Sequence, residues 1–185
     1  MNKYAFSLTF HLPDPRADPE VLLDALYEAG CDDALAGTGV HGTIGLDFQR
    51  VASSARRAIE SAVHDVTKAV PDAELIEISP DYIGVSEIAE LLGCTRQNAR
   101  KLVTNTTFPP AMHLSGHASI WRAVDVVDWA VENGRQITES DVERFRELAA
   151  AAAAMNAERQ FGRYGRVSRS TGGAQRIRRQ TAGGR

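Results

Sequence analysis

The chain has 185 residues, 43% of them hydrophobic, which is enough for one medium domain or two small ones and excludes global disorder. The net charge of −3 conceals an asymmetry, because residues 159–185 contain eight arginines and no acidic residue. Residues 1–158 contain 13 basic and 24 acidic residues, so we expect an acidic folded body with a basic tail.

Strand and helix patterns alternate over residues 1–80. Apolar side chains occupy every second position from Tyr4 to Leu12, which predicts a half-buried strand. Asp18-Pro19 is typical of a helix start, and Gly30 can end that helix. The predicted elements are a strand at 4–12, a helix at 18–30, strands at 34–38 and 44–48, a helix that follows Ser53 or Ser54 and ends at Pro71, and a strand at 73–78.

This β-α-β-β-α-β order resembles the ferredoxin-like fold, in which both helices cover one face of an antiparallel sheet. The other face is then polar, with Ser7, Thr9, His11, Thr43, Asp47 and Gln49. We expect residues 1–80 to form a homodimer, to sense a small molecule or to bind a protein partner. RNA binding is disfavoured, because Phe6 and Phe10 belong to the covered face and the segment has 6 basic and 13 acidic residues.

Three further patterns argue against an enzyme or a cofactor site. Residues 37–42 match the dinucleotide fingerprint G-x-G-x-x-G, but a strand pattern follows where the mechanism requires a helix. His113 and His117 lie on a predicted hairpin without a third ligand, and Cys31 and Cys94 fit no metal spacing. No apolar run approaches the roughly 20 residues of a membrane span. The two widely spaced cysteines lead us to expect a reduced cytoplasmic protein. From the patterns above we expect no metal, cofactor or catalytic residue.

A second module, residues 81–135, begins with two predicted helices joined by a tight turn. Gly84 or Ser86 caps the first helix, Gly93 forms the turn and Thr95 caps the second helix. Apolar residues of both helices face inward. The residues left outward on the second helix, predicted at 95–105, are Arg96, Gln97, Asn98, Arg100, Lys101 and Thr104. Arginine and amide side chains chelate base edges in the major groove, and lysine and threonine suit phosphates.

Residues about 82–134 resemble the winged helix-turn-helix of the MerR superfamily, in its excisionase and AlpA-like branch. The resemblance rests on the helix Glu87 to Gly93, the Thr-Arg-Gln start of the next helix, and the Phe108-Pro-Pro step. It continues in the wing turn Ser115-Gly-His117 and in the positions Trp121-Arg122, Asp125-Val126 and Trp129. The wing turn is less basic than is usual in that family.

The resemblance implies a protein that binds double-stranded DNA. It adds Thr95, Ser115, His117 and Arg122 to the candidate contacts, although Arg122 is equally well explained as a solvated charge on the wing. We expect Trp121 and Trp129 to be core residues. A short operator read by one helix favours a homodimer.

The C-terminal region divides into a predicted helix at 136–160 and a predicted disordered tail at 161–185. Thr138 to Asp141 resembles a capping box, and Val142, Phe145, Leu148, Ala149 and Ala152 form a thin apolar stripe. The arginine-rich tail would either contact DNA phosphates or bind an acidic surface such as residues 1–80.

The sequence therefore predicts an α+β protein with four parts: a ferredoxin-like domain, a winged helix-turn-helix, a helix and a basic tail. The function expected is a transcriptional regulator or an excisionase-like factor. The alternative is a protein-interaction module, such as an antitoxin or an adaptor, in which the helix-turn-helix is secondary.

Overall fold

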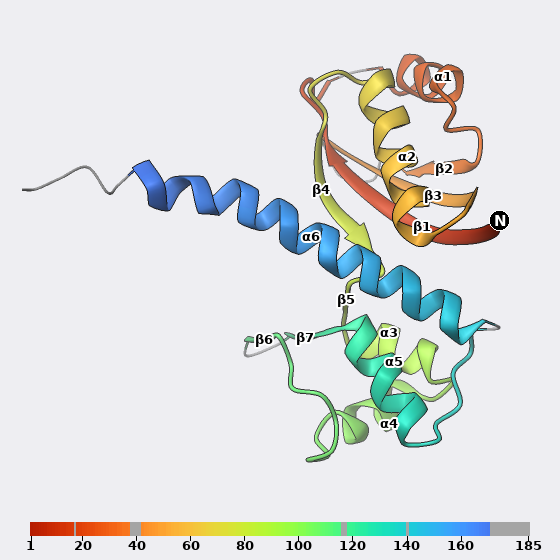
Figure 1. Ribbon diagram of the computed structural model, residues 1–185, viewed down its shortest axis with the longest axis vertical. Helices are drawn as coiled ribbons and strands as arrows, with labels where there is room; N and C mark the ends of the chain where they lie inside the picture. The colour runs from red at the N-terminus through yellow and green to blue at the C-terminus, as the bar shows by residue number, and fades with distance from the viewer. Residues whose placement is uncertain (17, 38–41, 116–117, 140, 171–185) are drawn as a thin grey trace, which may run out of the picture.

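The computed structural model describes residues 1–16, 18–37, 42–115, 118–139 and 141–170. It is an α+β fold with a four-stranded antiparallel sheet and a separate small sheet. Figure 1 shows a first unit that contains the larger sheet and two helices, and a second unit that contains three short helices. A long C-terminal helix passes between the two units.

The first unit follows the predicted order of elements. They are β1 (Asn2–His11), α1 (Pro19–Ala29), β2 (Ala34–Gly37), β3 (Thr43–Ala52), α2 (Ala55–Ala69) and β4 (Glu74–Ser79). Neighbouring strands lie in the order β2-β3-β1-β4. The Asp18 side chain accepts a hydrogen bond from the Glu20 amide, and Ser54 caps α2 through the Arg57 amide. Side-chain capping therefore starts both helices at the residues that the sequence predicts.

The core of the first unit lies between one face of this sheet and its helices. Tyr4, Phe6, Leu8 and Phe10 of β1 are buried, and Phe6 stacks on Phe48 of β3 with ring centroids 5.3 Å apart. Alternate residues of β1 and β3 lie on the opposite face, where the Ser7 hydroxyl donates to the Asp47 carboxylate at 2.5 Å. The predicted polar face is therefore present, and it leaves an open side to the sheet.

Arg50 is a buried charge within this core. Its guanidinium pairs with Asp33 at 2.9 Å and with Asp65 at 2.6 Å, and donates to the Gly30 carbonyl at the end of α1. The hydrogen bond to Asp33 is the largest cause that raises the pKa of Arg50. These bonds tie β3 to the loop after α1 and to α2, so the charge is compensated where it is buried.

The second unit contains β5 (Tyr82–Ile83), α3 (Val85–Leu91), α4 (Arg96–Leu102), β6 (His113–Ser115), β7 (Ala118–Arg122) and α5 (Ala123–Glu132). Its strands lie in the order β5-β7-β6. Strand β5 is not among the predicted elements, because two residues carry no detectable alternation. This short strand pairs with β7, so the hairpin is attached to the segment that enters from the first unit.

Helix α6 (Val142–Ser170) corrects the prediction for the C-terminal region. Residues 161–170 continue the helix instead of losing structure, and residues 171–185 lie outside the described part of the chain. The Asp141 carboxylate accepts from the Arg144 amide and caps the helix. Thr138 is not part of a capping box, because its hydroxyl donates to the carbonyls of Glu90 and Leu91 at the end of α3.

Helix α6 joins the two cores. Leu148 and Ala152 belong to the core of the first unit, whereas Ala149 belongs to the core of the second. Glu147 accepts from the Tyr4 hydroxyl at 2.8 Å and from the Ala55 amide at the start of α2 at 2.9 Å. The helix therefore fixes the first unit relative to the second instead of standing apart from both.

A buried polar junction lies where α6 crosses β4. The Asn156 side-chain amide bonds to both backbone groups of Ile78, as a neighbouring strand would, and so covers the free edge of β4. The same amide donates to Asp81 at 2.8 Å. Asp81 is fully buried and pairs with Arg122 at the start of α5. One hydrogen-bonded chain therefore links the first sheet, α6 and the second unit.

Candidate nucleic-acid interface

The turn between α3 and α4 is built as the sequence predicts. The Glu87 carboxylate accepts from the Gly84 amide at 3.1 Å, which places the cap of α3 at Gly84 and not at Ser86. Gly93 has a φ of 57°, and a Cβ there would lie 3.1 Å from Thr138. The Thr95 hydroxyl accepts from the Asn98 amide and caps α4. Glycine is therefore favoured at this turn by the positive φ, and a Cβ would in addition press on the Thr138 methyl group.

Helix α4 presents one anchored face and one exposed face. Ala99 is fully buried, and Leu102 and Val103 pack against the core of the second unit. The six residues predicted to face outward are all exposed: Arg96, Gln97, Asn98, Arg100, Lys101 and Thr104. The predicted N-cap and candidate contact Thr95 is exposed as well. Within the described part of the chain, the side chains of Arg96, Gln97, Arg100 and Lys101 have no hydrogen bond or ion pair, so their donors remain available to a ligand.

Helix α4 is shorter than predicted. It ends at Leu102, whereas the sequence pattern extends it to residue 105. Thr104 lies in the following turn, and its hydroxyl donates to the Lys101 carbonyl at 2.8 Å. This internal bond makes Thr104 a weaker candidate for a phosphate contact than the free side chains of α4.

Three aromatic rings pack together in the core of the second unit. The Phe108 ring lies 4.7 Å from Trp129 and 6.1 Å from Trp121, measured between centroids, and all three residues are buried. Trp121 donates its indole N–H to the Pro109 carbonyl at 3.1 Å. The Phe-Pro-Pro step is therefore clamped between the hairpin and α5, and both tryptophans are core residues, as expected.

The predicted hairpin contacts are less well placed. Ser115 is the last residue of β6, and its side chain is not described; His117 lies outside the described residues. Arg122 pairs with the buried Asp81, and its guanidinium lies 4.7 Å from the centroid of the Tyr82 ring. This arginine is engaged inside the protein and is not a solvated wing charge, so it is less available to DNA than the exposed side chains of α4.

A wider charge pattern singles out the same region. Residues 91–124 contain four basic residues and no acidic residue, although the body around them is acidic. The polar residues Asn105, Thr106 and Thr107, between α4 and the hairpin, are also exposed. They are not among the predicted contacts, although the acid-free run that contains them is a signal for a surface that a polyanion can approach.

The described residues contain no group of three or more His, Cys, Asp or Glu side chains placed to hold a metal ion, and Cys31 and Cys94 are both free. None of the described helices is long and apolar enough to cross a membrane. Comparisons of the chain with protein-family models, with curated proteins and with solved structures find no match.

Proposed function

We propose that this protein binds double-stranded DNA sequence-specifically, as a transcriptional regulator or an excisionase-like factor, and reads the major groove with α4. The observation that carries the proposal is the exposed face of α4, where two arginines, a lysine and a glutamine have no partner in the described chain. Arginine recognises guanine and glutamine recognises adenine through paired hydrogen bonds to base edges. The buried face of α4 fixes the direction in which these side chains point.

The surrounding architecture supports the same proposal. The order α3, glycine turn, α4, β6-β7 hairpin and α5 supports the proposal of a winged helix-turn-helix in which the hairpin is the wing. In the first unit, the strand order and the two helices that share one core support the proposal of a ferredoxin-like domain. We propose that this domain serves in dimerisation or partner binding in the cytoplasm, and that no catalytic step is involved.

Selection from a random pool of duplexes tests the proposal. The purified chain is incubated with duplexes that carry a randomised central segment, and the bound fraction is sequenced over several salt concentrations. We expect one enriched motif, which persists as salt weakens the contribution of phosphate contacts. Equal recovery of all sequences at every salt concentration would contradict the proposal. It would favour the alternative, in which the exposed α4 face binds an acidic protein.

A further inference from the structure

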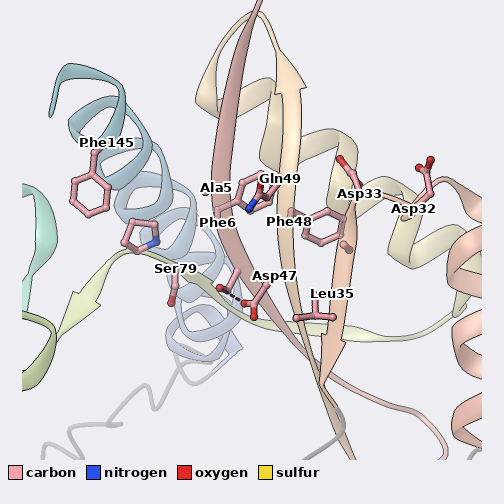
Figure 2. Close-up of a pocket in the computed structure, with 13 residues that line it drawn as sticks. Ala5, Phe6, Asp32, Asp33, Leu35, Asp47, Phe48, Gln49, Ser79 and Phe145 are labelled. Carbon is pink, nitrogen blue, oxygen red and sulfur yellow. Dashed lines mark hydrogen bonds between the residues drawn. The ribbon is translucent and has the colours of Figure 1, made fainter. Parts of the chain in front are cut away.

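The open face of the first sheet carries a groove that nothing in the described chain fills. The groove has a volume of about 640 Å³ and crosses the sheet from β2 to the segment after β4. Figure 2 shows Leu35 at one end, Ser79 and Phe145 at the other end, and Asp47 between them. Asp32 and Asp33 border the same groove. Leu35 and Phe145 therefore mark two apolar ends, with Asp47 between them and Asp32 and Asp33 on the Leu35 side, where Asp33 is paired with Arg50.

The groove and the far end of α6 are complementary in charge and in apolar character. Phe161 and Tyr164 are 78% and 66% exposed, which is unusual for two aromatic residues one turn apart on a helix. They lie in a segment, residues 159–170, with four arginines and no acidic residue, although Arg159 and Arg163 bond to Ile76 and Glu74 of β4 in their own chain. The first unit, in contrast, has 6 basic and 13 acidic residues over positions 1–80. An aromatic, basic helix end matches a groove with apolar ends and acidic walls.

The end of α6 cannot reach the groove of its own chain. Phe145, near the start of α6, already lines that groove. Phe161 follows sixteen residues later on the same helix, which places it about 24 Å away at 1.5 Å per residue. Figure 1 shows the last turns of α6 extending beyond the second unit. The Phe161–Tyr164 end can therefore fill such a groove only in another molecule.

A second copy of the chain can supply the occupant, and each copy then fills the groove of the other. When two α6 helices run antiparallel about a two-fold axis, Phe161 of each copy lies near Phe145 of the other, and both grooves are filled by the same operation. Direct packing of two open sheet faces is a poorer solution, because it brings Asp47 and Asp32 of both copies together. We infer that the chain dimerises by docking the Phe161–Tyr164 end of α6 into the sheet groove of its partner.

This inference deepens the proposed role of the first unit in dimerisation and is independent of the proposed DNA binding, because dimerisation is measured in the absence of DNA. Sedimentation equilibrium of the full chain should give a dimer. The double variant Phe161→Ala/Tyr164→Ala should raise its dissociation constant by about 30-fold or more, as expected for buried aromatic anchors. Asp47→Lys should also weaken the dimer from the groove side. Matched controls on α1, Tyr27→Ala and Glu28→Lys, change an exposed aromatic and an exposed acid outside the groove and should leave it intact.

Photocrosslinking then tests the contact directly. The chain with p-benzoylphenylalanine in place of Tyr164 is mixed with ¹⁵N-labelled chain and irradiated, and the products are digested. We expect crosslinks that join light to heavy peptides and that end between Leu35 and Gln49. A monomer at concentrations up to about 0.1 mM, where even weak dimers form, would overturn the inference. Crosslinks confined to one chain, or that join only α6 to α6, would also overturn it.

Discussion

Replacement of Asn156 by alanine tests the junction between the two units most sharply. Its amide accepts from the Ile78 amide at 3.1 Å and donates to the Ile78 carbonyl at 2.9 Å and to Asp81 at 2.8 Å. Alanine leaves three buried polar groups without these bonds, each at a cost of about 1–3 kcal/mol. Allowing for water that enters the space, we expect the free energy of unfolding to fall by about 3–5 kcal/mol.

Helix propensity cannot explain such a loss, because alanine favours a helix more than asparagine does, by several tenths of a kcal/mol. Urea unfolding is followed by circular dichroism and by tryptophan fluorescence. Both tryptophans lie in the second unit, so fluorescence reports on that unit. The two transitions should coincide in the parent chain and separate in the variant. Gln160→Ala, an exposed polar position on the same helix, is the matched control and should change stability by less than about 0.5 kcal/mol. A fall of less than about 1 kcal/mol for Asn156→Ala, with coincident transitions, would refute this role of the junction.

Three further predictions concern the core, the cysteines and the tail. Trp129→Ala should leave a cavity beside Phe108 and lower the free energy of unfolding of the second unit by about 3–5 kcal/mol, measured by urea unfolding. A stable variant with weakened DNA binding would instead make Trp129 a DNA contact. Cys31 should react with a thiol reagent at pH 8 far more slowly than Cys94, because burial raises the pKa of Cys31 to about 11 and keeps it a thiol; equal rates would contradict its burial. Deletion of residues 171–185 removes four arginines. The slope of log affinity for DNA against log salt concentration should then flatten by about 0.9 for each phosphate that the tail no longer neutralises. An unchanged slope would exclude the tail from DNA binding.

Local sequence patterns predict most of the helices and strands. The features that they do not predict involve contacts between residues that are distant in the sequence. The alternation in β1 and the cap at Ser54 can be recognised from a few neighbouring residues. The end of α6 was missed because its sequence is rich in Gly and Arg. That part of the helix contacts residues that are distant in the sequence: Arg163 pairs with Glu74, and Arg159 donates to the Ile76 carbonyl. Such partners leave no periodic signal along the chain.

The candidate site likewise contains residues whose placement the sequence predicts and residues whose role it does not. The outward face of α4 could be predicted because helical spacing alone separates it from Ala99 and Leu102. The role of Arg122 could not be predicted, because its partner Asp81 lies 41 residues earlier and is buried by packing. Asn156 was also missed, because a lone polar residue near a run of alanines gives no sign of which backbone it will bond.

The interactions of Arg163 and Arg159 also bear on the two expected roles of the basic segment. Both arginines contact β4 of the acidic first unit. This is the kind of surface that the basic segment would contact if it binds an acidic surface instead of DNA. The ion pair of Arg163 is largely exposed, so it contributes little to stability and salt weakens it.

The measurement that tests the central claim most directly is the ratio of affinities for the selected duplex and a random duplex. It is compared between the parent chain and the variant Arg96→Ala/Gln97→Ala/Arg100→Ala. Each replacement should cost about 1–3 kcal/mol of discrimination while circular dichroism shows an intact fold. The control Arg57→Ala/Lys68→Ala removes an equal positive charge from exposed positions on α2 and should keep the ratio. An unchanged ratio in the triple variant would contradict the assignment of α4 as the DNA-reading helix.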